Sequence, residues 1–447
     1  MFNTIKNALK TPDIRRRIGY TLLLIIIFRL GCFISVPTVN PAVLSAQDGI
    51  TSGGFSQLIN TLTGGAFKRL SIFAMSITPY ITASIVIQLL GMVIPSLEKL
   101  TKEGGEAERA KINRYTKILT LFLSFAEGLG IYLTYKGGVM VNGVLTPVFI
   151  NAGPMTAALV VLSFIAGTAL LMWLGEQITT KGIGNGISML IFVGIISGLP
   201  EAVKTVYNMV FATEFKTTNL LLALGIIIGA VILITAVVFV QQAERRVPVQ
   251  YSKKVVGRKM VGGQNTHIPL KLAMAGVMPI IFASSFMTFP AMIIQIFNKD
   301  IAEQSGFLAG LYKLSIATST SSVPIGYSIA NAAIYLLLIL GFTFFYTYAT
   351  FNPAEISSNI KKNGGFIPGI RTGKPTTDYL SSVITKITVF GGLFLAVIAI
   401  LPMLLRFTDI DLAFGGTSIL IIVGVALETM QQLESQVVMK HYKGFLE

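Results

Sequence analysis

Apolar residues along this chain gather into long, nearly continuous runs. A helix of about 20 residues crosses the roughly 30 Å hydrocarbon core of a bilayer. Runs of this length are typical of spanning helices, whereas a membrane barrel shows short segments of alternating polarity. The pattern predicts an all-α, polytopic membrane protein with ten transmembrane helices, near residues 18–36, 70–94, 115–135, 155–174, 187–211, 218–240, 272–297, 325–349, 380–405 and 412–433.

Positive charges divide unevenly between the loops that join these runs. With a cytoplasmic N-terminus, 26 of the 35 Lys and Arg residues fall in inner segments and 8 in outer ones, and Arg29 lies inside the first run. Basic residues concentrate in cytoplasmic loops, so we expect both termini in the cytoplasm. The first run, 18–36, exceeds the usual apolar core of a signal peptide, and we interpret it as a span.

The composition agrees with a membrane protein and excludes most soluble enzymes. Apolar residues make up 53% of the 447 residues and charged residues only 12%, with a net charge of +15 and a mean hydropathy of +0.73. One cysteine, Cys32, and two histidines, His267 and His441, predict neither an internal disulfide nor a zinc cluster. A phosphate-binding loop is missing, because Gly373 and Lys374 are followed by proline. We expect no cofactor, no metal and no enzymatic activity.

Two kinds of segment outside the runs allow more than one interpretation. The inner loops 241–271 and 350–378 are long and basic, and their charge either only sets the topology or offers a docking surface for RNA or an acidic protein. The outer segment 49–66 is rich in glycine and too polar to span. It is either an amphipathic helix on the outer face or a re-entrant element among the helices.

One segment resembles a known family. Residues 172–188 read MWLGEQITTKGIGNGIS, which is similar to the signature of the SecY/Sec61-alpha family of protein-conducting channels. Further matches cover nearly the whole chain, at 28–31, 79–85, 275–285, 366–371 and 414–418. The resemblance implies two pseudo-symmetric halves, residues 1–212 with spans one to five and 213–447 with spans six to ten. Between them, unfolded secretory polypeptide would cross the bacterial plasma membrane.

The resemblance also assigns roles to individual side chains. It implies a hydrophobic pore ring, and aliphatic rings hinder water and ions by dewetting. Two of its pairs are spaced i, i+4 and so project from one helix face. The ring would comprise Ile77, Ile81, Ile187, Ile191, Ile281 and Ile421.

A plug and a lateral gate are implied as well. The plug, at about 55–65, would seal the outer side of the ring and includes Phe55, Leu58, Ile59, Asn60, Leu62, Gly64 and Gly65. The gate would release transmembrane segments and signal sequences sideways between spans two, three, seven and eight. Its polar residues would be Thr82, Ser84, Gln88, Ser284, Ser285 and Thr288, although ordinary interhelical hydrogen bonding also accounts for such groups.

The basic inner loops acquire partners through the same resemblance. They would bind the translating ribosome, through rRNA phosphates, or the SecA motor ATPase, which would supply the energy. The implied contact residues are Lys253, Lys254, Arg258, Lys259 and Arg371. The membrane subunits SecE and SecG are further implied partners. One departure from the family pattern is the segment 271–274, which reads KLAM where many members carry an asparagine.

Two other functions remain as alternatives at this stage: a secondary solute transporter and a membrane scaffold without transport. Charges inside spans usually mark transporter sites. Those in or near the runs are Arg29, Glu127, Glu176, Arg406 and Glu428. They do not form a chain of carboxylates through the bilayer, which favours the channel.

Overall fold

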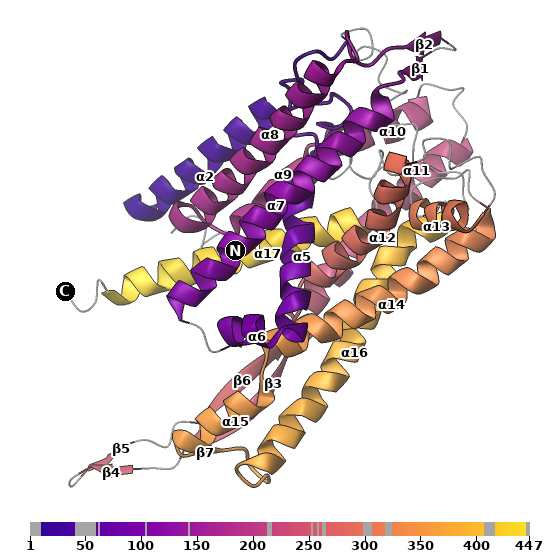
Figure 1. Ribbon diagram of the computed structural model, residues 1–447. Helices are drawn as coiled ribbons and strands as arrows, with labels where there is room; N and C mark the ends of the chain where they lie inside the picture. The colour runs from indigo at the N-terminus through magenta and orange to yellow at the C-terminus, as the bar shows by residue number, and fades with distance from the viewer. Residues whose placement is uncertain are drawn as a thin grey trace.

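The computed structural model describes residues 10–40, 60, 63–102, 105–141, 144–211, 217–251, 254–256, 259–261, 265–297, 306–317, 324–405 and 416–443. Within them the chain forms a bundle of long helices (Figure 1). Each of the ten predicted runs coincides with a helix, the fifth with two. These helices are α2 (Pro12–Gly31), α5 (Thr78–Val93), α7 (Glu106–Tyr135), α8 (Pro154–Lys181), α9 (Gly186–Ile196), α10 (Leu199–Phe211), α11 (Thr217–Gln242), α12 (Met278–Phe297), α14 (Ile325–Thr350), α16 (Lys374–Leu405) and α17 (Gly416–Lys443).

Length and composition alone qualify six of the described helices as membrane spans: Ala110–Tyr135, Pro154–Lys181, Gly186–Asn208, Leu220–Gln242, Ile325–Lys362 and Lys374–Leu401. Two further predicted runs are shorter apolar helices, Thr78–Gly91 and Met278–Ala291. Both begin several residues later than their apolar runs. Pro79 and Pro279 each occupy the second helical position, where proline is accommodated while the residue before it is pushed away from helical geometry.

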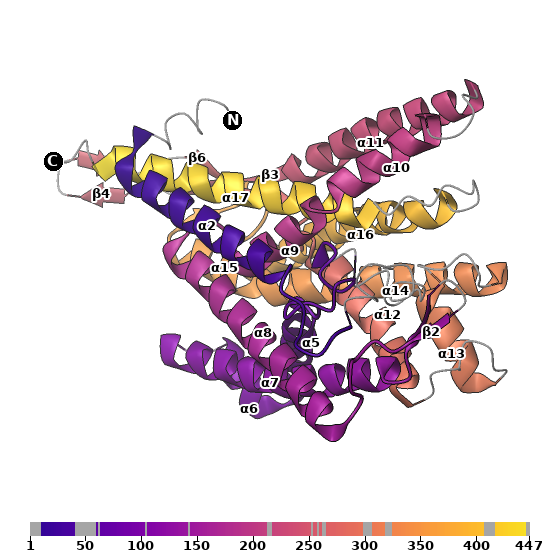
Figure 2. The same ribbon diagram turned by 90° about the horizontal axis from the view of Figure 1, so that it is seen from above.

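The helices of the bundle pack in two groups that meet at α12 (Figures 1 and 2). Helix α7 packs against α5 and α8, and α14 packs against α12 and α16. Helix α12 crosses from the second group to the first, because it also packs against α5 and α7. Helix α17 contacts α9, α11 and α16. Helices from the two ends of the chain therefore meet at α12 and at α17.

Small β-structures stand outside the bundle. Strand β3 (Glu244–Tyr251) pairs antiparallel with β6 (Asn265–Lys271) and with β7 (Gly365–Phe366). Two hairpins, β4 (Lys254–Val256) with β5 (Lys259–Val261) and β1 (Val139–Val141) with β2 (Val144–Thr146), lie at opposite ends of the molecule (Figure 1). Three short helices complete the fold: α6 (Pro95–Lys102), α13 (Phe307–Ile316) and α15 (Pro353–Lys362).

The strands β3, β6 and β7, helix α15 and the first turns of α16 form one body, which we call the sheet unit. Its core comes from both basic loops and from α16, and consists of Val247, Val249, Leu270, Ile360, Ile367, Leu380 and Ile384. The two loops predicted as separate segments therefore fold together. Alternation of buried and exposed residues along β3 supports this core.

Candidate functional site

The six isoleucines predicted to form a ring contribute to one apolar cluster. Ile77, Ile191 and Ile421 are buried within it. Ile81, Ile187 and Ile281 are partly buried and pack against it. These side chains come from α5 and the turn before it, and from α9, α12 and α17. The fold thus gathers at one place residues that are up to 344 positions apart in the sequence, and we call this group the isoleucine cluster.

The signature segment positions the two isoleucines of α9. Helices α8 and α9 approach so closely that a Cβ on Gly186 would overlap the carbonyl oxygen of Gly175. The Asn185 side chain caps α9 by accepting from the backbone N–H groups of Ile187 and Ser188, at 3.1 and 3.4 Å. Ile187 and Ile191 therefore project from the first two turns of a helix whose start is fixed, and both contact the cluster.

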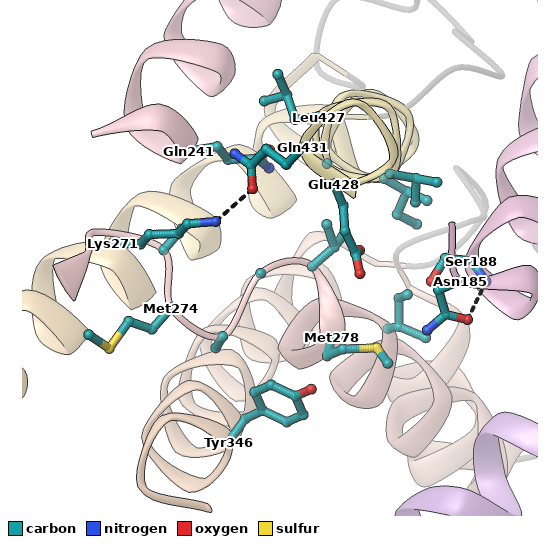
Figure 3. A pocket seen from close by; sticks show the side chains of 18 of the residues that line it. Asn185, Ser188, Gln241, Lys271, Met274, Met278, Tyr346, Leu427, Glu428 and Gln431 are labelled. Atoms are coloured by element: carbon teal, nitrogen blue, oxygen red, sulfur yellow. Dashed lines mark hydrogen bonds between the residues drawn. The ribbon is translucent and has the colours of Figure 1, made fainter. Parts of the chain in front are cut away.

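A cavity of about 300 Å³ opens beside the cluster (Figure 3). Ile191, Ile281 and Ile421 line one part of it. Lys271 and Glu428 line another, together with Asn185, Ser188, Gln241, Tyr346 and Gln431. We call this cavity the vestibule. Its polar rim can hold water, whereas the isoleucines present a surface without hydrogen-bonding groups.

The contact between α5 and α12 is an apolar seam. Ile85 of α5 is buried in a cluster with Ile280, Phe282 and Ala283 of α12. The polar residues predicted to form the gate bond mainly within their own helices. The hydroxyls of Thr82, Ser284 and Thr288 donate to backbone carbonyls three or four residues earlier, and the Gln88 amide donates to Ser84 Oγ at 3.0 Å. Thr288 also reaches the carbonyl of Ser285. These described hydrogen bonds do not cross the seam, unlike the interhelical bonding that was the alternative.

Only part of the predicted plug can be described. Phe55, Leu58, Ile59 and Leu62 lie outside the described residues. The turn between Asn60 and Lys68 is held by two hydrogen bonds to Asn60. The backbone N–H of Gly65 donates to the Asn60 carbonyl at 3.0 Å, and that of Lys68 donates to the Asn60 side chain at 3.0 Å.

Arg29, the charge inside the first span, reaches the same turn. Its Nη1 donates to the carbonyl oxygen of Gly64 at 3.4 Å. Gly64 and Gly65 have φ of +61° and +86°, values that favour glycine. Arg29 therefore faces protein, as charges inside membrane spans usually do.

Three of the five predicted docking residues are among the described residues, and they lie on the sheet unit or its projecting hairpin. Lys254 and Lys259 belong to β4 and β5, whereas Lys253 and Arg258 lie outside the described residues. Arg371 is exposed in the loop between β7 and α16, where its carbonyl accepts from Thr376 Oγ1 at 2.8 Å. The structure thus places the described docking residues on one side of the bundle (Figure 1).

Comparison with known proteins settles the family. A family model described as SecY matches residues 71–430. Protein translocase subunit SecY of Halalkalibacterium halodurans is 44% identical over 100% of both chains. The proteins of that name from Bacillus subtilis and Streptomyces coelicolor are 42% and 41% identical, again over 100% of both chains. This chain belongs to the SecY family.

Solved structures agree on the fold. A structure described as "The structure of a protein conducting channel" matches with a TM-score of 0.61 at 21% identity, over 93% of this chain and 91% of that one. Sec61 in a canine ribosome-channel complex matches with a TM-score of 0.56 at 19% identity and the same coverage. SecY-family membership makes this multi-pass membrane protein a channel subunit of protein translocase and not an enzyme.

Two of the charges that a transporter would need have structural partners in this SecY-family chain. Arg29 bonds to Gly64, as described above, and Glu176 of α8 forms an ion pair with Lys117 of α7 at 2.5 Å. Arg406 lies outside the described residues. Glu127 is buried on α7, and Glu428 lines the vestibule.

Some residues of the site were not anticipated from the sequence. Ile85 extends the i, i+4 series of Ile77 and Ile81, so the spacing could have identified it. The packing of Gly175 on Gly186 left no comparable signal. Lys271, in the segment that departs from the family pattern, bonds through Nζ to Gln431 Oε1 at 2.7 Å. Because these two residues are 160 positions apart, only the fold reveals the pair.

Proposed function

We propose that this SecY-family chain conducts unfolded secretory polypeptide across the bacterial plasma membrane through the isoleucine cluster. The observation that carries the proposal is the meeting of six aliphatic side chains from both predicted halves beside a water-accessible vestibule. Residues 1–212 and 213–447 would be the two halves that move apart.

The chemistry of the cluster suits a passage that must accept any sequence. Aliphatic side chains offer no hydrogen-bond donors or acceptors, so a sliding chain meets no fixed polar partner. When the passage is empty, the same side chains close on one another and exclude water and ions by dewetting. A ring of isoleucine therefore combines a seal with tolerance of many substrates.

The seam between α5 and α12 supports a lateral exit for signal sequences and transmembrane segments. Its polar groups are already bonded within their helices, so parting the helices leaves few hydrogen bonds broken. Ile85 and its partners on α12 would then be exposed, and an apolar helix of the substrate can cover them. Thr82, Ser84, Gln88, Ser284, Ser285 and Thr288 would flank this exit.

The segment at about 55–65 would serve as the plug. Its C-terminal part, from Asn60 on, is fixed by hydrogen bonds with Lys68 and Arg29, which provides an anchored end. Movement of the plug would then begin on the N-terminal side of this anchor.

The sheet unit and the β4–β5 hairpin would receive the partner that supplies energy. Basic residues there, including Lys254, Lys259 and Arg371, suit rRNA phosphates or the acidic face of the SecA motor. The canine Sec61 structure is a complex with the ribosome, which supports the ribosome as a partner here. SecE and SecG would complete the membrane complex.

Cross-linking of an arrested substrate tests the path directly. In a Cys32→Ala background, one cysteine is placed at Ile81 or Ile187, and a secretory chain with its own cysteine is arrested halfway. Disulfides are expected from both positions and should follow the register of the arrested chain. The matched control is Ile118→Cys, on the exposed face of α7, which should give none.

Two outcomes would count against the proposal. If neither cluster position cross-links in membranes that still export the substrate, the chain passes elsewhere. If Ile118→Cys cross-links as well as the cluster positions, the substrate is not confined to the predicted path.

A further inference from the structure

The strand β6 and the helix α12 are joined by a short linker, residues 271–277. It runs between α16 and α17, and a glycine on each helix gives it room. A Cβ on Gly391 of α16 would lie 2.5 Å from the carbonyl oxygen of Leu272, and one on Gly424 of α17 would overlap the side chain of Val277. The start of α12 is therefore closely fitted between these two helices.

One polar contact fixes the beginning of the linker. Lys271 Nζ donates to Gln431 Oε1 of α17 at 2.7 Å, and both residues line the vestibule (Figure 3). The next residue is also held, because the Leu272 N–H donates to the Ala243 carbonyl at the end of α11, at 2.9 Å. The donor is charged, which strengthens the bond to Gln431, but both side chains are exposed and water competes with it. Glu428, one turn earlier on α17, points into the same cavity.

The two helices joined by this contact share α16 as a neighbour but differ in their other contacts. Helix α12 packs across the seam on α5 and α7, whereas α17 packs on α9. A role for this contact in opening requires that the second half does not move as one rigid body when the seam opens. If α12 leaves α5 and α7 while α17 keeps its contact with α9, the linker must shift along α17. The bond between Lys271 and Gln431 is then stretched or broken.

We propose that Lys271 is a positioning residue for the seam, and that its bond to Gln431 is a clasp that holds α12 in the seam-joined arrangement. This inference rests on the proposed function, because it takes the seam to be the lateral gate. Since Lys271 is also the last residue of β6, the clasp lies where the sheet unit continues into α12. Loosening the clasp is expected to lower the threshold for opening.

The test uses the complete translocase with its motor, reconstituted in proteoliposomes. The readout is the ratio of transport of a substrate with a defective signal sequence to transport of one with an intact signal. Lys271→Met should raise this ratio by up to about fivefold, the range that one exposed charged contact allows. Lys271→Arg should keep the ratio near that of the parent.

An exchange of partners distinguishes the clasp from a general effect of charge. The double variant Lys271→Gln with Gln431→Lys keeps the net charge and restores a lysine–glutamine pair, so it should return the ratio toward the parent value. The control Lys386→Met removes an exposed lysine of α16 and should change nothing.

The possible failures separate the inference from the function. An unchanged ratio in Lys271→Met, or no recovery in the exchanged pair, overturns the clasp while normal export of the intact-signal substrate leaves the channel in place. Failure of the parent complex to transport either substrate overturns the proposed function and the clasp with it.

Discussion

The isoleucine cluster and the core of the sheet unit are both built from aliphatic side chains, yet they are held together differently. In the sheet unit, β3 pairs in register with β6, Asn352 caps α15, and the Ser357 hydroxyl donates to the Gly373 carbonyl at 2.9 Å. The cluster instead joins side chains from four separate helices. Backbone hydrogen bonds hold the strands of the sheet unit together. The isoleucine cluster depends on side-chain packing alone, so its helices can separate at a lower cost.

Aliphatic side chains hold the sheet unit together, whereas similar side chains in the isoleucine cluster are proposed to part. Burial of aliphatic surface is favourable and non-directional, so by itself it does not specify one set of neighbours. Hydrogen bonds add that specificity in the sheet unit. Isoleucine side chains form no hydrogen bonds, which under the proposed function would let the cluster open and close again around substrates of different sequence.

The largest expected effect is in the sheet unit. Leu380→Ala truncates a fully buried side chain and should destabilise the unit by about 2–5 kcal/mol, through lost burial and the cavity left behind. Protease treatment of inverted membrane vesicles should then cleave the unit much faster, while the ion tightness of the membranes stays unchanged. Val389→Ala, on an exposed part of the same helix, is the control. Equal cleavage of both variants would show that the core does not hold the unit together.

A smaller effect is expected in the cluster. Ile191→Ser places a hydroxyl in the apolar cluster, and a hydrogen-bonding group there lowers the cost of hydrating the proposed passage by about 1–3 kcal/mol. Ion flux through proteoliposomes containing the complex should rise about tenfold. Ile191→Leu conserves volume and should remain tight. A serine variant as tight as the parent would exclude Ile191 from the seal.

The smallest effect should come from the surface charges. Replacing Lys254 and Lys259 with glutamine should weaken binding of ribosomes only a few-fold, because an ion pair in contact with water contributes about 0–1 kcal/mol. The loss should shrink as salt is raised, since phosphate contacts depend on counterion release. Binding titrations at two salt concentrations measure both quantities. A loss independent of salt would indicate that the hairpin acts through its shape.

Much of this architecture could be predicted from the sequence, because long apolar runs and the distribution of lysine and arginine report directly on spans and sidedness. The positions of Ile77 and Ile191 in one cluster followed from family resemblance, not from hydrophobicity, since isoleucine in a span usually faces lipid or packing. The sheet unit was missed because its strands supply only a few alternating residues, such as Val247 and Val249. Its remaining core lies on α15 and α16, far along the chain.

The close approach of Gly175 and Gly186 has a consequence for the membrane around the protein. Helix α8 is 28 residues long and packs against α2 and α7. The close approach of the two glycines fixes the position of α9 along this helix. A helix bundle adapts to bilayers of different thickness when its helices tilt or when the surrounding lipid thins or thickens. The isoleucine cluster should keep the same position along α8 in all of these bilayers. Its depth in the membrane is therefore set by helix packing and not by the thickness of the lipid.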